Sequence, residues 1–197
     1  MKTLLTVALL TLTTTTAAAQ AFAPFGISFT ATADDLRRMG GTLGNDGYWA
    51  IPKPPTPNPE FTAYAASVAP SGRICSIYGT GRIITTSGDG EVVKAQFNKL
   101  KTVLQTKYGS SNDYDTLSSS SIYTGTTDWM TAVQKNERNF VSFWSSSSKA
   151  VIPTGVSEIY IVVSAFDSTR GRVSVYYRTA NYESCTKERD TLPRTGL

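Results

Sequence analysis

Residues 156–180 read VSEIYIVVSAFDSTRGRVSVYYRTA, and the alternation of their side chains predicts two antiparallel strands joined by a turn at DSTRG. In the second strand, Val173, Val175 and Tyr177 alternate with polar or larger side chains, which indicates one buried and one exposed face. Residues 158–166 are apolar on both faces. The first strand should therefore lie inside a sheet.

Residues 89–109, DGEVVKAQFNKLKTVLQTKYG, show the period of an amphipathic helix that ends at Gly109. Lys94 and Lys101 lie on one face, and apolar side chains recur on the other. The apolar face consists of Val93, Phe97, Leu100, Leu104 and Tyr108. We expect this face to cover the sheet.

Further segments complete the predicted fold. Residues 61–69 and 72–86 read as two strands joined by a hairpin turn. A shorter helix over residues 126–139 should bury Trp129 and Val133, and a strand follows it. This order predicts the α+β class, an antiparallel β-sheet of about five strands with two main helices packed on one face.

The composition divides the chain into four segments. We expect a signal peptide over residues 1–21, a short strand, short helix and Pro-rich arm over 22–60, an α+β domain over 61–186, and a flexible tail over 187–197. Within the arm, PFGISF predicts the strand, and Thr32 is placed to cap the helix.

The first segment has the pattern of a secretory signal peptide. Lys2 supplies a positive charge, residues 4–12 (LLTVALLTL) form an apolar core, and small residues allow cleavage after Ala19 or Ala21. A retained membrane anchor is the alternative, but the apolar run falls short of the roughly 20 residues that span a bilayer. We expect export to the periplasm or out of the cell, with no membrane span after cleavage.

Residues Leu192 to Gly196, LPRTG, match the pentapeptide that sortases cleave when they attach proteins to a bacterial wall. A wall-sorting signal also needs a hydrophobic stretch and a basic tail after the pentapeptide, and one residue follows it here. We expect the match to be coincidental and the protein not to be sortase-anchored.

The two cysteines, Cys75 and Cys185, are expected to form a disulfide in an oxidising compartment. The alternative, a reactive thiol, lacks an activating partner because the chain contains no histidine. The same absence removes the Ser-His-Asp and Cys-His catalytic arrangements and histidine-bound metals. We therefore expect no cofactor and no metal site, and the absence of histidine favours a non-enzyme over an enzyme.

The charge pattern argues against nucleic acid as a partner. The formal net charge is +4, and the basic residues are scattered among acids without a long run. An acidic segment at Asn112, Asp113 and Asp115 lacks the further oxygen ligands of a calcium loop, so we expect a surface loop there.

Two groups of residues are candidates for a binding surface. Arg172, Tyr176 and Arg178 lie on the exposed side of the last predicted strand, although an ordinary sheet face also explains them. Tyr48 and Trp49, in the Pro-rich arm, could belong to a binding surface or pack as a clasp.

Residues 72–109, the segment DWMTAVQKNER and the closing VYYRTANYESC resemble an uncharacterised family of small exported bacterial proteins. The resemblance covers most of the chain after residue 21. It implies export and the fold class, and it assigns no activity.

Three functions remain open. The first is an exported non-catalytic binding protein of the bacterial cell envelope, whose partner would be a protein, a polysaccharide or a lipid. The second is an envelope hydrolase that uses two carboxylates or a Ser-Lys pair, which requires those groups within hydrogen-bond reach. The third is a periplasmic carrier of a lipid or small ligand, which requires an apolar cavity between helices and sheet.

Overall fold

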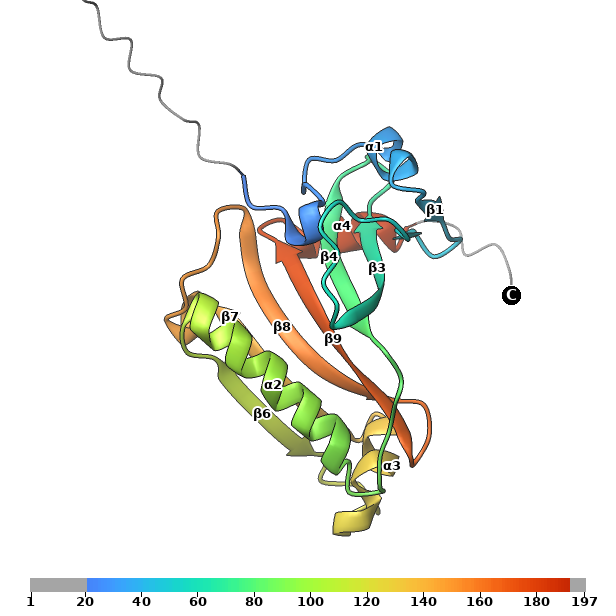
Figure 1. Cartoon of the computed structure of the whole chain (residues 1–197), viewed down its shortest axis with the longest axis vertical. Coiled ribbons are helices and arrows are strands. Elements are labelled where there is room, and N and C mark those ends of the chain that lie inside the picture. The colour runs from blue at the N-terminus through green and yellow to red at the C-terminus, as the bar shows by residue number, and fades with distance from the viewer. Residues whose placement is uncertain (1–20, 192–197) are drawn as a thin grey trace, which may run out of the picture.

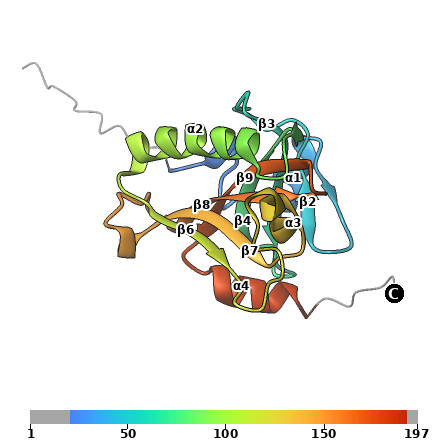
Figure 2. The same ribbon diagram turned by 90° about the horizontal axis from the view of Figure 1, so that it is seen from below.

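The computed structural model describes residues 21–191, which form one sheet with helices on both sides (Figures 1 and 2). The sheet has nine strands in the order β1-β2-β3-β4-β9-β8-β7-β6, with β5 paired to β9. Every pairing is antiparallel. The predicted signal peptide, apart from Ala21, and the predicted pentapeptide lie outside the described residues.

The described residues form four α-helices and nine strands. The helices are α1 (Ala33–Arg38), α2 (Glu91–Tyr108), α3 (Trp129–Gln134) and α4 (Tyr182–Arg189). The strands are β1 (Thr42–Leu43), β2 (Tyr48–Ala50), β3 (Phe61–Val68), β4 (Ile74–Gly81), β5 (Ile84–Thr85), β6 (Asn112–Leu117), β7 (Arg138–Ser145), β8 (Val156–Ala165) and β9 (Arg170–Thr179). Of the helices within residues 21–191, none is long and apolar enough to cross a membrane.

The α+β class with an antiparallel sheet is confirmed, but the prediction of about five strands was too small. Strand β6 replaces the predicted acidic loop. Its sequence, NDYDTL, lacks an apolar face, and most of its side chains are exposed. Backbone pairing with β7 therefore forms this strand, and such pairing leaves no hydrophobic pattern in the sequence.

The N-terminal arm also differs from the prediction. PFGISF forms no strand, because a short 3₁₀ helix, η1 (Pro24–Gly26), turns the chain with Phe25 at φ 56°. The Phe25 ring packs edge-on against the rings of Phe61 and Tyr64, at centroid distances of 5.6 and 4.8 Å. Further along the arm, β1 and β2 extend the sheet beyond β3.

Helix α2 covers one face of the sheet, as its apolar pattern predicts (Figure 2). All five residues of its predicted apolar face are buried. Helix α3 buries Trp129 and Val133, also as predicted, and the Trp129 ring packs against Phe140 of β7. The core therefore lies between these helices and the sheet.

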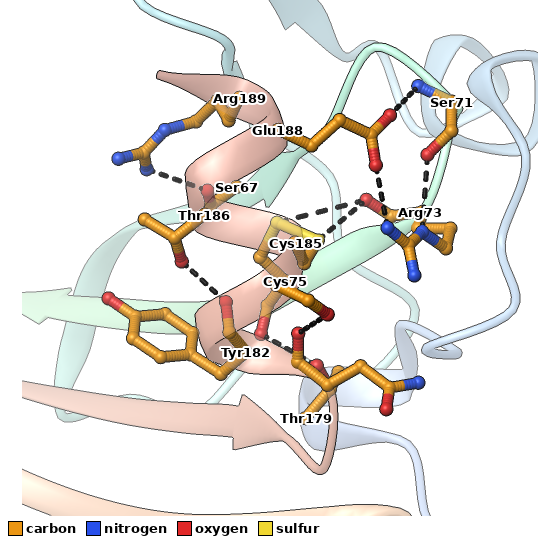
Figure 3. The surroundings of a disulfide bond; sticks show 12 residues. Ser67, Ser71, Arg73, Cys75, Thr179, Tyr182, Cys185, Thr186, Glu188 and Arg189 are labelled. Carbon is orange, nitrogen blue, oxygen red and sulfur yellow. Dashed lines mark hydrogen bonds and ion pairs between the residues drawn. A yellow bond between two sulfur atoms is a disulfide. The ribbon is translucent and has the colours of Figure 1, made fainter. Parts of the chain in front are cut away.

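Helix α4 lies on the opposite side of the sheet from α2 (Figure 2). Figure 3 shows the predicted disulfide, Cys75–Cys185, which ties this helix to β4. Cys185 is its one buried residue, and polar contacts provide the other attachments. Arg189 donates hydrogen bonds to the hydroxyls of Tyr48 and Ser67. The helix continues to Arg189, inside the segment predicted as a tail from residue 187.

Glu188→Gln is expected to remove an acid-sensitive contribution to stability. Hydrogen bonds from Ser71, and then from Arg73, lower the pKa of Glu188 from 4.5 to about 2. Because the folded pKa is depressed, the contribution is complete above pH 4.5 and is lost as the pH falls toward about 2. Urea unfolding should therefore show a smaller loss of stability over this window in the variant than in the wild type. Equal losses of stability in the variant and the wild type would show that the contacts of Glu188 with Ser71 and Arg73 do not stabilise the fold.

Candidate functional site

The sheet face that points away from α2 carries the candidate site, and we call it the open face. Residues paired across strands share a face, so the register places Tyr78, Tyr176 and Tyr160 together on this face. Their neighbours Ile77, Tyr177 and Ile159 point to the α2 side and are buried. Among residues 21–191, α4 is the helix on the open face, and it covers one end.

Four tyrosines from four strands form a row across the open face, which we call the tyrosine row. It consists of Tyr48 (β2), Tyr78 (β4), Tyr176 (β9) and Tyr160 (β8). The ring centroids lie 5.9, 5.0 and 4.6 Å apart along the row. Phe143 of β7 is the register partner of Tyr160, and its ring stacks on exposed Tyr114 of β6 at 5.4 Å. Aromatic side chains thus extend toward the β6 edge.

The central rings of the row stand upright on the sheet. Tyr160 and Tyr176 stack with an interplanar angle of 3°, and Tyr176 and Tyr78 with 23°. Their spacing matches the distance of about 4.8 Å between strands, so each ring presents its face to the next ring. The stacked faces of these rings are therefore covered, and their edges are the parts left accessible.

Arg178 is held within this aromatic surface. Its guanidinium lies 4.4 Å from the centroid of the Tyr160 ring and 4.3 Å from that of Tyr182 in α4. It forms an ion pair with Glu158 and donates a hydrogen bond to the Tyr160 hydroxyl. Arg178 thus links α4 to the tyrosine row.

Burial makes the hydroxyls of Tyr78, Tyr160 and Tyr176 harder to ionise than that of an exposed tyrosine. It raises the pKa of Tyr78 to about 12, with smaller contributions from neighbouring Tyr176 and Tyr48. Burial also raises the pKa of Tyr160 and of Tyr176. These hydroxyls therefore remain available as hydrogen-bond donors.

Tyr78→Phe is expected to remove a late step from the ultraviolet titration of the tyrosines. Because the pKa of Tyr78 is raised to about 12, the phenolate absorbance change near pH 12 should shrink by one tyrosine. The change near pH 10, where unperturbed tyrosines ionise, should stay the same. If the absorbance change near pH 10 were smaller in the variant instead, Tyr78 would be a solvent-exposed tyrosine in the wild type.

The structure brings four of the five predicted surface residues together. Tyr48, Arg172, Tyr176 and Arg178 belong to the open face, whereas Trp49 points to the other side and is 5% exposed.

Tyr78 and Tyr160 of the row were not predicted from the sequence. In both strands the tyrosine lies between residues that face the core, as in Ile77-Tyr78-Gly79. That alternation was a usable signal, but only the pairing of β4 with β9 and of β9 with β8 aligns the rings.

A groove of about 580 Å³ at the end of the open face bears on the hydrolase hypothesis. Glu158 and Glu183 both line it, which supplies two carboxylates. Glu158, however, forms the ion pair that holds Arg178. Asp113 and Asp115 form ion pairs with Lys101 and Arg138. Three of these four carboxylates, all except Glu183, therefore have a structural role.

The carrier hypothesis requires a cavity between α2 and the sheet, and apolar side chains fill that space. Val93 and Phe97 of α2 are 0% and 2% exposed. A groove of about 550 Å³ lies instead beside the disulfide, where Phe29, Ile74 and Cys185 contribute to its lining. Within the described residues, no group of three or more His, Cys, Asp or Glu side chains could hold a metal ion.

No family model, curated protein or solved structure matches the chain. The resemblance to an exported bacterial family stays a prediction. Function is therefore inferred from the open face itself.

Proposed function

We propose that this chain is an exported, non-catalytic binding protein of the bacterial cell envelope, and that it docks a partner protein on its open face. The observation that carries the proposal is the tyrosine row, an aromatic surface across strands β2, β4, β9 and β8 that α2 and α3 leave uncovered. The disulfide and the signal-peptide pattern of residues 1–21 support export.

The composition of the open face favours a protein partner. Tyrosine and arginine are enriched in the parts of protein interfaces that contribute most to affinity. Tyrosine also offers a large contact area for little loss of side-chain entropy, because two torsions fix the ring. Apolar Val141 and Val162, paired across β7 and β8, continue the surface beside the row and are partly exposed.

The orientation of the rings argues against a polysaccharide partner. Sugar rings pack against the flat faces of aromatic side chains. The faces of Tyr160 and Tyr176 are stacked on each other, with 4.6 Å between centroids. The ring edges remain accessible, and these suit contacts with the side chains of a protein.

Site-specific photo-crosslinking in the exporting cell tests the proposal. A photoreactive phenylalanine would replace Val162 on the open face or, as a control, Val103, which is 58% exposed on α2. We expect one partner protein to be captured from position 162 and not from position 103. Capture from position 103 alone, or equal capture from both positions, would contradict the proposal.

A further inference from the structure

Arg172 differs from the other arginines of the open face because it has no partner there. Among residues 21–191, it makes no ion pair and no hydrogen bond, and its Nε is buried without a hydrogen-bond partner. The guanidinium lies 4.9 Å from the centroid of the Phe166 ring. Aromatic side chains thus hold a cation that lacks a counter-charge.

Seven of the nine arginines in this part of the chain form an ion pair. The pairs are Arg37–Asp34, Arg38–Asp35, Arg73–Glu188, Arg138–Asp115, Arg170–Asp167, Arg178–Glu158 and Arg189–Asp190. Of the two others, Arg82 is exposed to water, whereas Arg172 is partly buried. Partial burial removes solvation from Arg172, and an unmatched charge of this kind costs free energy.

Arg172 shares the open face with the tyrosine row and lies on the same strand as Tyr176. Its charge acts on the hydroxyls of Tyr78 and Tyr176, and it opposes the rise in pKa that burial causes there. Glu158, the acid on the same face of β8, is already bound to Arg178. Asp46, whose charge also acts on Tyr78, forms no ion pair with Arg172. Arg172 therefore has no counter-charge among residues 21–191, and an acidic group from outside would supply one.

We propose that Arg172 receives the carboxylate of an aspartate or glutamate of the partner protein. This assignment rests on the proposed function and names the chemistry of the partner. A guanidinium binds a planar carboxylate through two parallel hydrogen bonds. The partial burial of Arg172 reduces its contact with water, which strengthens such a charged pair.

A displayed random-peptide library tests this proposal without knowledge of the natural partner. The library is selected on the wild-type protein and, separately, on Arg172→Gln. Arg82→Gln is the matched control, because it removes the same charge from an exposed site on the α2 side, next to Gln96 and Lys99. We expect an acidic position in the peptides selected by the wild type and by Arg82→Gln, and its loss with Arg172→Gln.

The affinity of a selected peptide then measures the contact. Arg172→Gln, or Glu→Gln in the peptide, should each weaken binding by about 10- to 100-fold. The double change should weaken it little further, because both substitutions remove one interaction. Additive losses would overturn the proposal. Arg172→Gln should keep the melting temperature of the wild type, since it removes an unmatched charge, so unfolding cannot account for the loss.

The outcomes separate this proposal from the proposed function. Selected peptides that lack an acidic position, yet lose binding on Val162→Arg, would support protein docking and overturn the role of Arg172. Peptides that bind Val162→Arg as well as the wild type would contradict docking on the open face. Arg172-dependent binding of oligogalacturonate, with no acidic peptide selected, would assign the carboxylate to a polysaccharide and overturn the proposal.

Discussion

Replacing Cys75 and Cys185 together with alanine is expected to lower the free energy of unfolding by about 4–5 kcal/mol. The two cysteines are separated by 110 positions in the chain, and a bridge across so long a loop restricts the unfolded chain strongly. The folded state depends on it locally too, because Cys185 is the one buried residue of α4. The loss should therefore come with release of α4 from the sheet.

Urea unfolding measures the loss, and amide hydrogen exchange measures the release. Exchange in residues 182–189 should become fast in the double variant, while that of β8 and β9 stays slow. Glu188→Gln serves as the control, because it removes one polar attachment of α4 and keeps the disulfide. A loss below about 1 kcal/mol in the double variant would show that the disulfide adds little to the fold.

Trp144→Ala is expected to cost about 3–5 kcal/mol. Its indole is 0% exposed on the α2 side of β7, and its Nε1–H donates a 2.8 Å hydrogen bond to the carbonyl of Gly109, at the end of α2. Truncation would leave a cavity and remove this link between helix and sheet. Trp144→Phe should cost less, about 1–3 kcal/mol, because it keeps an aromatic ring but leaves the carbonyl without its donor.

The neighbouring residue provides the control for the Trp144 prediction. Phe143 lies on the open face and is partly exposed, so Phe143→Ala should cost less than Trp144→Ala in the same urea experiment. An equal or larger loss of stability in Phe143→Ala would mean that Phe143, and not Trp144, faces the core. Phe143 would then not extend the aromatic surface from the tyrosine row toward β6.

Local periodicity predicted the elements that pack against the core. The spacing of Val93, Phe97 and Leu100 identified the buried face of α2, and Val173 and Val175 identified that of β9. Elements without an apolar face escaped the same reasoning. Strand β6 is polar on both faces, and β1 has two residues, both exposed, so pairing with a neighbour defines each of them.

The candidate site was predictable in part. Tyr176 and Arg178 stood out because they lie opposite a buried face of one strand. The tyrosine row, to which Tyr176 belongs, depends on the pairing of β4 with β9. These strands lie far apart in the chain, and Tyr78 and Tyr176 are register partners across them. A single sequence contains each tyrosine but not this pairing. That Arg172 has no ion-pair partner among residues 21–191 is likewise visible only when the partners of its neighbours are known.

The most direct test of protein docking on the open face compares two identical substitutions on opposite faces. Val162→Arg places a charge beside the tyrosine row, and Val103→Arg places the same charge on the exposed side of α2. The dissociation constant for the cross-linked partner should rise at least about 30-fold with Val162→Arg and stay unchanged with Val103→Arg. Full affinity in folded Val162→Arg, or a loss confined to Val103→Arg, would contradict the account.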